Sequence, residues 1–483
     1  MTRAPGALSS ASHDPAAKLP FVRGCPLPSP ARPSSPSATA RPPRAPVIAR
    51  QREPLPAVHD MPRVLVVADK FPPTIGGIQT FACRLTAGLP PDRAVVLAPT
   101  QPGDAEFDRT LGFPVIRTEH GMITSPRGRR ELRAAVRAHG CEVAWFPTAA
   151  PLGVLAPVLR EAGVERVVAS SHGHEVAWSR LPFGRLLVST VGARVDVLTY
   201  LTEFTRRRLA AVTPPGTELA RLTGGVDTER FQPGAGGDEI RRGLGWSDEP
   251  VVICVARLVT RKGQDTLIRG WHDVRRRHPY ARLLLVGGGP AEDRLRRLAA
   301  RTGVSDGVHF AGPVPEELLP AYLDAADVFA MPSRTRLCGL DLEGLGLSAL
   351  EGAASGLPVI TGAQGGAPDV VIPGRTGVAV NGHDRTAVAA AVIDLLDDPR
   401  QAERMGAAGR AWMRAAWSWE TLSLRLAGIL SGQAPTGAGA AADAAWIAAD
   451  AEDGADAEAG ARTAVAVGGA RVGMTVPERG DGR

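Results

Sequence analysis

Short apolar runs rich in β-branched residues alternate with amphipathic helical stretches along the middle of the chain. The first group of runs covers residues 63–68, 94–98, 143–146, 166–170 and 196–200. After a Gly- and Pro-rich stretch (223–237), a second group covers residues 250–256, 282–286, 308–310, 328–330 and 358–360. Helical periodicity falls between the runs, at residues 78–89, 129–138, 264–276, 291–301 and 315–325. Strands separated by helices predict parallel sheets with right-handed crossovers, so two such groups predict an α/β protein with two Rossmann-like domains.

The two ends of the chain lack this pattern. Residues 1–60 contain thirteen prolines, with eight basic and three acidic residues, and residues 433–483 are rich in Ala, Gly and Asp. Such compositions bury too little apolar surface to offset the entropy of ordering, so both ends are predicted to be disordered. For residues 1–60, two interpretations stay open: a basic tail of the protein, or a translation start at Met61 that leaves these residues untranslated. The folded part then divides into an N-terminal domain (61–225) and a C-terminal domain (226–432).

Composition excludes several classes of protein. The mean hydropathy is −0.04 and no apolar run approaches about 18 residues, so no transmembrane helix is predicted. The five cysteines lie far apart without a C-x-x-C pair, which disfavours a disulfide framework or a zinc finger and fits a reducing cytoplasm. Only three of the 56 basic residues are lysines (Lys18, Lys70 and Lys262), as expected of a GC-rich genome. The net charge of +6 is therefore a weak argument for nucleic acid, and no nucleic-acid partner is expected.

Common nucleotide and metal motifs are missing. A glycine run at 287–289 lacks the third glycine of a dinucleotide fingerprint, because position 292 is Glu, and a tight strand-to-helix turn is expected there. No P-loop and no H-E-x-x-H helix occur. His172 and His174 do not have the spacing of metal ligands on one helical face, so no metal is expected.

One basic turn stands out. The apolar run that opens the second block ends at Arg257, and Lys262 follows five residues later, just before a helix. Two cations at the carboxyl end of a strand and the start of a helix can converge on one diphosphate. A solvated basic turn is the alternative, but one of only three lysines lies here.

Two glutamates bracket a glycine-rich turn farther on. Glu343 precedes Gly344-Leu345-Gly346, and Glu351 lies eight residues after Glu343, about two turns into the following helix. The turn offers backbone N–H groups and the positive end of the helix to a phosphate or a sugar hydroxyl. A carboxylate at position 351 can accept hydrogen bonds from a pair of ribose hydroxyls.

A pair of glycines follows the first strand. Gly76-Gly77 leads into a helix, and paired glycines allow the backbone to approach a ligand closely. A plain loop is the alternative interpretation.

These motifs together resemble glycosyltransferase family 4, the retaining enzymes of GT-B fold, over residues 61–432. The resemblance rests on Gly76-Gly77, the segments 171–175 and 225–227, Arg257 with Lys262, and Glu343-x7-Glu351. It implies that residues 61–225 form the acceptor domain and residues 226–432 the donor domain, whose final helices pack back on the first domain. Within the family, the segments 172–178, 261–265 and 335–346 look like those of actinobacterial GDP-mannose-dependent phosphatidylinositol monomannoside mannosyltransferases.

The resemblance implies roles for individual residues. Catalysis would involve His172 near the scissile bond, Arg257 and Lys262 at the leaving diphosphate, and Glu343 at the hexose. The donor-binding set is Gly76, Gly77, Arg257, Lys262, Glu343, Gly344, Leu345, Gly346 and Glu351. The family implies transfer with retention of configuration, with no cofactor and no required metal. Its favoured route is a front-face reaction in which the leaving phosphate takes the acceptor proton.

The resemblance also implies the substrates: GDP-mannose as donor, and a lipid acceptor of the phosphatidylinositol mannoside type. Departures at residues 337–338 and 348–349, near the donor sugar, leave alternatives open. These are a UDP-hexose donor with a soluble or glycan acceptor, and a non-catalytic nucleotide-sugar-binding subunit. Arg130, Arg133 and Arg137 share one predicted helical face. The chain is accordingly expected in the cytoplasm and peripherally on the inner face of the plasma membrane; the oligomeric state is not predicted.

Overall fold

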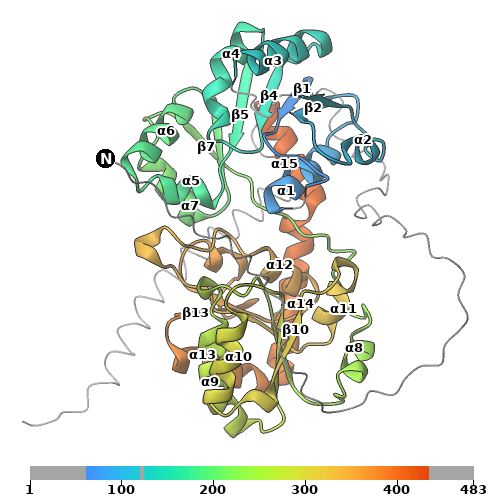
Figure 1. Cartoon of the computed structure of the whole chain (residues 1–483), viewed down its shortest axis with the longest axis vertical. Coiled ribbons are helices and arrows are strands. Elements are labelled where there is room, and N and C mark those ends of the chain that lie inside the picture. The colour runs from blue at the N-terminus through green and yellow to red at the C-terminus, as the bar shows by residue number, and fades with distance from the viewer. Residues whose placement is uncertain (1–60, 75, 120–124, 434–483) are drawn as a thin grey trace, which may run out of the picture. The chain divides into compact units, whose positions relative to one another are not determined.

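The computed structural model describes residues 61–74, 76–119 and 125–433 (Figure 1). The disorder predicted for residues 1–60, and for 433–483 beyond residue 433, lies outside the described residues, as does the side chain of Cys338.

The first half of the described chain forms a seven-stranded sheet in the order β3-β2-β1-β4-β5-β6-β7, with every neighbouring pair parallel. Its strands are β1 (Val64–Val67), β2 (Ala94–Pro99), β3 (Val115–Thr118), β4 (Val143–Phe146), β5 (Arg166–Ser170), β6 (Val197–Tyr200) and β7 (Glu218–Arg221). Its helices are α1 (Gly77–Ala87), α2 (Asp104–Asp108), α3 (Pro126–His139), α4 (Ala156–Glu161), α5 (Gly173–Trp178), α6 (Pro182–Gly192) and α7 (Glu203–Ala210).

Helices cover both faces of this sheet. Because side chains of a strand alternate between faces, Leu65 of β1 packs in one core with Leu132 of α3 and Val188 of α6. The neighbouring Val66 packs in the opposite core with Phe81 of α1. A strand buried on both faces is apolar at every position, which explains why β1 is a continuous Val/Leu run.

The second half forms a six-stranded parallel sheet in the order β10-β9-β8-β11-β12-β13. Its strands are β8 (Val251–Val255), β9 (Arg282–Val286), β10 (Val308–Gly312), β11 (Val328–Met331), β12 (Val359–Gly362) and β13 (Gly377–Val380). Its helices are α8 (Gly237–Gly243), α9 (Gln264–Arg277), α10 (Glu292–Arg301), α11 (Leu319–Asp324), α12 (Leu347–Ala354), α13 (Arg385–Asp397) and α14 (Pro399–Trp412). The predicted class, α/β with two Rossmann-like sheets, is therefore confirmed.

Both sheets reverse their order of strand addition at one point. The reversal lies between β1 and β4 in the first sheet and between β8 and β11 in the second. In open parallel sheets, ligands bind beyond the carboxyl ends of the strands at such a reversal. The loops after β1, β4, β8 and β11 are therefore the first places to look for a site.

The last described helix, α15 (Trp419–Leu430), follows a π-helical turn (Met413–Trp417). It returns to the first sheet, where Leu422 and Leu426 join the core that contains Phe81 of α1. Figure 1 shows α15 beside α1. The boundary between residues 225 and 226 remains a prediction.

The sequence pattern did not predict β3, β7 and β13. All three are edge strands, and their residues are partly exposed. β3 and β7 include charged residues, which an edge strand tolerates because it is buried on fewer sides than a central one. β13 is apolar, and it lies at the opposite edge of its sheet from β10, an edge strand that the pattern did predict. The predicted helix over 315–325 is divided between a 3-10 turn (Glu316–Leu318) and α11.

Candidate active site

The centre of the site is an ion pair between two predicted site residues. Lys262 ends a 3-10 turn (Thr260–Lys262) after β8, and Glu343 lies in the loop after β11. Because β8 and β11 are neighbours at the order reversal, their loops meet, and Lys262 Nζ lies 2.6 Å from Glu343 Oε2. Both side chains are largely buried, and Arg261 Nε lies 3.7 Å from the same oxygen. The carboxylate therefore faces two cations.

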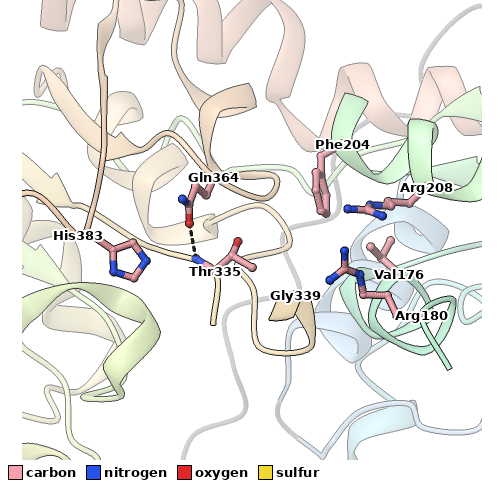
Figure 2. A pocket seen from close by; sticks show the side chains of 8 residues that line it. All are labelled: Val176, Arg180, Phe204, Arg208, Thr335, Gly339, Gln364 and His383. Carbon is pink, nitrogen blue, oxygen red and sulfur yellow. Dashed lines mark hydrogen bonds between the residues drawn. The ribbon is translucent and has the colours of Figure 1, made fainter. Parts of the chain in front are cut away.

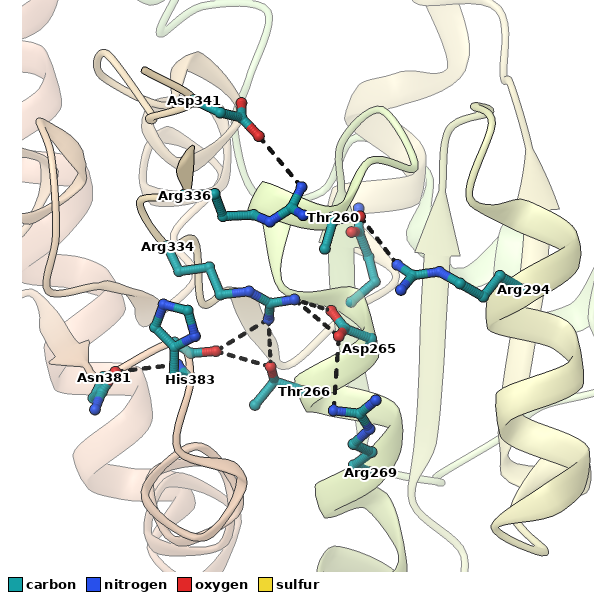
Figure 3. A network of polar contacts seen from close by, with 12 residues as sticks. Thr260, Asp265, Thr266, Arg269, Arg294, Arg334, Arg336, Asp341, Asn381 and His383 are labelled. Atoms are coloured by element: carbon teal, nitrogen blue, oxygen red, sulfur yellow. Dashed lines mark hydrogen bonds and ion pairs between the residues drawn. The ribbon is translucent and has the colours of Figure 1, made fainter. Parts of the chain in front are cut away.

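A buried network holds these two loops together. The backbone N–H of Arg334 donates to the carbonyl of Arg261 at 2.8 Å. The Arg334 guanidinium donates to both oxygens of Asp265, at 2.7 and 2.8 Å, and to Thr266 Oγ1 at 2.7 Å (Figure 3). A bidentate pair of this kind fixes geometry as well as charge, so it orients the turn that carries Lys262. Neither Arg334 nor Asp265 was predicted as a site residue.

Arg257 is placed differently from Lys262. Its side chain is exposed, and no ion-pair partner for it occurs among the described residues. Its backbone loop packs on the glycine turn after β9, where Gly287 has a φ of +124° and a Cβ on Gly289 would lie 2.6 Å from the carbonyl oxygen of Leu258. The tight-turn interpretation of this glycine run is confirmed, and the Arg257 guanidinium is free to bind an anion.

The second glutamate of the motif lies inside a helix. Gly346 caps α12 with a φ of +99°, a conformation that favours glycine, and Glu351 follows within the helix. Burial raises the pKa of the half-buried Glu351 to about 7; nearby Arg230 opposes the rise and Glu316 adds to it. This carboxyl therefore changes its charge near neutral pH, in the place where the motif predicts a ribose ligand.

His172 is the buried N-cap of α5. Its Nε2 lies 2.7 Å from the carbonyl oxygen of Pro147, and its ring packs edge-on against Phe81 with centroids 5.1 Å apart. Burial lowers the pKa of His172, despite the nearby Glu175 carboxylate, so the ring is neutral at pH 7. A carbonyl can only accept, so Nε2 carries the proton and Nδ1 keeps its lone pair. His172 can thus accept a hydrogen bond from a hydroxyl, but it carries no positive charge.

Glu175 positions this histidine and was not predicted as a site residue. It is fully buried, accepts the backbone N–H of His172 at 2.7 Å, and lies 3.2 Å from His174 Nε2. Burial alone would lower the pKa of His174, but the hydrogen bond and charge of Glu175 raise it. The sequence signal was a glutamate three residues after the cap, the spacing of a capping box.

The loops of the two sheets meet at backbone level. A Cβ on Gly173 would lie 3.3 Å from Gly344 Cα, so the His172 and Glu343 loops touch at a point where neither carries a side chain. A Cβ on Gly77 would lie 3.8 Å from Leu347 Cδ1, at the start of α12. The structure thus brings Gly77 next to the start of α12 and the His172 loop next to the Glu343 loop, whereas the neighbour of Gly76 is Gln79 of its own helix. Arg257 and Glu351 lie outside this set of contacts.

A pocket of 340 Å³ is lined by residues of α5 and α7 and of the loops after β11, β12 and β13. Figure 2 shows Arg180 and Arg208 at one end with Phe204, and Thr335, Gln364 and His383 at the other. Arg180 and Arg208 were not predicted as site residues, since single arginines carry little signal in a chain whose basic residues are nearly all arginine.

The described residues contain neither a metal-binding cluster nor a membrane-spanning helix. No group of three or more His, Cys, Asp or Glu side chains in the described ranges is arranged to hold a metal ion. Among the helices of residues 61–74, 76–119 and 125–433, none is both long and apolar enough to cross a membrane.

Comparison with known proteins gives consistent matches. The family model for glycosyltransferase family 4 matches residues 75–230, and that for glycosyl transferases group 1 matches residues 237–412. A GDP-mannose-dependent alpha-(1-6)-phosphatidylinositol monomannoside mannosyltransferase of Mycolicibacterium smegmatis is 44% identical over 376 residues, covering 77% of this chain and 98% of the relative. The Corynebacterium glutamicum enzyme for the monoacylated form of that acceptor is 43% identical over 377 residues, covering 77% and 98%.

Solved structures agree on the fold. The Anabaena protein HepE in complex with UDP superposes with a TM-score of 0.66 at 18% identity, covering 77% of this chain and all of HepE. Sucrose-phosphate synthase of Thermosynechococcus elongatus gives 0.62 at 24% identity, covering 76% and 98%. With the paired sheets and the contacts between their loops, these matches confirm the resemblance drawn from the motifs: the chain is a glycosyltransferase of GT-B fold and belongs to family 4.

Proposed function

We propose that this enzyme transfers mannose from GDP-mannose, with retention of configuration, to a lipid acceptor of the phosphatidylinositol monomannoside type. The similarity to enzymes with this activity extends over nearly their whole length. The structural observation that carries the proposal is the meeting of Lys262 and Glu343 at the order reversal of the second sheet.

The leaving diphosphate would bind to the two cations after β8. Arg257 is exposed and unpaired among the described residues, and Lys262 stands against Glu343. Charge-assisted hydrogen bonds from preorganised cations stabilise the negative charge that develops as the sugar–phosphate bond breaks. In this proposal Lys262 binds a diphosphate oxygen while Glu343 accepts hydrogen bonds from the mannose hydroxyls.

The remaining predicted residues surround the sugar and the ribose. Glu351 would accept the ribose hydroxyls, and the backbone N–H groups of residues 344–346 would bind the hexose side of the donor. Gly76 and Gly77, of which Gly77 lies next to Leu347, would let the loop after β1 approach the diphosphate. The neutral His172 would accept a hydrogen bond from a mannose hydroxyl near the scissile bond.

Bond making and breaking would occur on one face of the sugar. The bond between the mannose anomeric carbon and the phosphate oxygen breaks, and the acceptor oxygen bonds to the same carbon from the same side. The departing phosphate oxygen takes the proton of the acceptor hydroxyl. Atoms and charge balance without a protein base, and the described site requires only groups that orient the donor and stabilise charge.

Peripheral docking on the inner leaflet belongs to the same proposal. The sequence pointed to the basic face of α3, where Arg130 and Arg137 are exposed. Arg133, between them, pairs with Glu161 at 2.6 Å. Each exposed cation near an anionic leaflet contributes about 1 kcal/mol to the free energy of membrane binding. A triple Arg130→Glu/Arg133→Glu/Arg137→Glu variant should then bind anionic vesicles more weakly, and unchanged binding would exclude α3 as the docking helix.

A ligand panel tests the proposed donor. Thermal unfolding is followed with GDP, UDP or ADP; a nucleotide at 100 times its dissociation constant adds about 2.7 kcal/mol of stability. We expect GDP to give the largest shift. A larger shift with UDP would favour a UDP-hexose donor, and nucleotide binding without donor turnover would favour a non-catalytic subunit.

A further inference from the structure

The corner between α5 and α6 exposes large apolar side chains. Phe183 is 81% exposed and Leu186 is 65% exposed, and Trp178 and Leu181 are exposed beside them. The opposite face of α6 places Val188 and Val191 in the core of the first sheet. The helix is therefore apolar on its outer as well as its inner side. A contiguous exposed apolar patch on a folded protein is typical of a binding surface.

The segment that forms this corner carries charges of one sign only. Arg180 and Arg185 are exposed between the apolar side chains, and no acidic residue occurs from 176 to 195. Neither arginine has an ion-pair partner in the described part of the chain. An apolar surface flanked by cations, with an aromatic residue at its edge, fits the boundary between head groups and acyl chains of an anionic membrane.

The pocket beside this corner contains a second unpaired cation. Arg208 stacks over Phe204, with its guanidinium carbon 5.5 Å from the ring centroid, and it has no carboxylate partner in the described ranges. Figure 2 shows its guanidinium and that of Arg180 directed into the same end of the pocket. Two like charges at one site repel each other unless an anion lies between them, and guanidinium groups bind phosphate oxygens in a bidentate manner.

We propose that this corner binds the acceptor as an anionic phospholipid in a bilayer. Arg180 and Arg208 bind the phosphodiester of the lipid, and Trp178, Phe183 and Leu186 enter the boundary between head groups and acyl chains. The inference rests on the proposed function, because it places the head-group sugar of the lipid toward the loop after β11, which lines the pocket and carries Glu343. The corner between α5 and α6 is a different surface from α3, because none of the large exposed apolar side chains among the described residues lies on α3.

The first experiment separates the apolar surface from the donor site. Co-sedimentation of the full-length protein with vesicles of phosphatidylcholine containing phosphatidylinositol is compared for wild type, Phe183→Ser/Leu186→Ser, and the matched control Tyr280→Ser. Tyr280 is another exposed aromatic side chain, 74% exposed, on the second half of the chain. We expect at least about a tenfold weaker partition for the double variant and no change for the control. Equal vesicle binding by all three proteins would overturn the proposal. It would also be overturned if sedimentation velocity showed a dimer for wild type and a monomer for the double variant, because the patch would then bind a second copy of the chain.

The second experiment tests the phosphate site with two acceptors. Transfer rates are measured with the lipid acceptor and with its deacylated, water-soluble form. The Phe183→Ser/Leu186→Ser variant should lose activity on the lipid only, whereas Arg180→Gln and Arg208→Gln should raise KM at least about tenfold for both acceptors. Full activity of both arginine variants on both acceptors would overturn the phosphate assignment. GDP binding, followed by thermal shift, should be the same in every variant. If the wild-type protein binds GDP but uses neither acceptor, that result contradicts the proposed function itself and does not bear on the phosphate site.

Discussion

Lys262 Nζ lies 2.6 Å from Glu343 Oε2, so the proposed diphosphate cation and the proposed sugar carboxylate form an ion pair in the free enzyme. The pairing compensates two largely buried charges before substrate arrives. Donor binding would then exchange one set of charge contacts for another, with Lys262 turning to phosphate and Glu343 to sugar hydroxyls. The two residues are thus coupled, and substitutions should show it.

Replacing Lys262 alone should damage both activity and stability. In Lys262→Met, turnover is expected to fall roughly 10²–10³-fold, the loss typical of one preorganised charge-stabilising group. The variant also leaves the Glu343 carboxylate with Arg261 alone, at 3.7 Å, so its midpoint of thermal unfolding should fall. Adding Glu343→Gln should restore most of the unfolding midpoint but none of the turnover. Additive effects of the two changes on stability would contradict the coupling.

Arg257 offers a contrast, because its side chain is exposed and unpaired in the described part of the chain. Arg257→Ala should lower turnover by a similar roughly 10²–10³-fold while leaving the unfolding temperature unchanged, since no folded-state contact is lost. Steady-state kinetics and calorimetry on the same preparation measure both. Wild-type turnover would remove Arg257 from the diphosphate site.

Glu351 should make nucleotide binding depend on pH. Its pKa is raised to about 7, so the carboxyl is mostly protonated at pH 6 and mostly ionised at pH 8. If ribose hydroxyls donate to the ionised form, the fraction of competent enzyme, and hence GDP affinity, rises about tenfold over this range. GDP itself titrates in this region, so Glu351→Gln is the control, and only the difference between the two proteins is interpreted. Identical pH profiles would contradict the ribose role.

The same raised pKa has a consequence for stability. The unfolded carboxyl ionises near 4.5 and the folded one near 7, so the folded state binds more protons between these values. The free energy of unfolding should therefore fall as pH rises from 4.5 through 7. The Glu351→Gln variant has no titrating group at this position, so it should lack this part of the decrease. Unfolding midpoints of the two free proteins at pH 5 and pH 8 measure it; a constant difference between them would contradict the burial of this group.

Gly346 should be intolerant of a side chain. Its φ of +99° lies in the left-handed region, and an added Cβ would lie 3.1 Å from Met331 Cε. Gly346→Ala is expected to destabilise the protein by about 1–2 kcal/mol, measured by denaturant unfolding. Gly243→Ala is the matched control, because Gly243 has ordinary helical backbone and nothing lies within 4 Å of its Cβ position. Equal effects would show that conformation at Gly346 is not the cause.

The sequence revealed the central strands because burial on both faces makes them uniformly apolar, as in β1 and β8. The edge strands β3 and β7 include charged residues and lack that signal. Within the site, the rarity of lysine pointed to Lys262, and spacing pointed to Glu343 and Glu351. Arg334 and Asp265 are 69 positions apart in the sequence, and no local sequence pattern predicts a contact over that separation. Arg180 and Arg208 become recognisable only when folding places them in one pocket.

The most direct test is the transfer reaction itself. Purified full-length protein is incubated with GDP-α-D-mannose or UDP-α-D-glucose and a phosphatidylinositol monomannoside acceptor, and the anomeric configuration of the new linkage is read by nuclear magnetic resonance. We expect a single added mannose in the α configuration from the GDP donor, and loss of the product in Lys262→Met. A β linkage, or transfer from UDP-glucose in preference to GDP-mannose, would contradict the proposed activity.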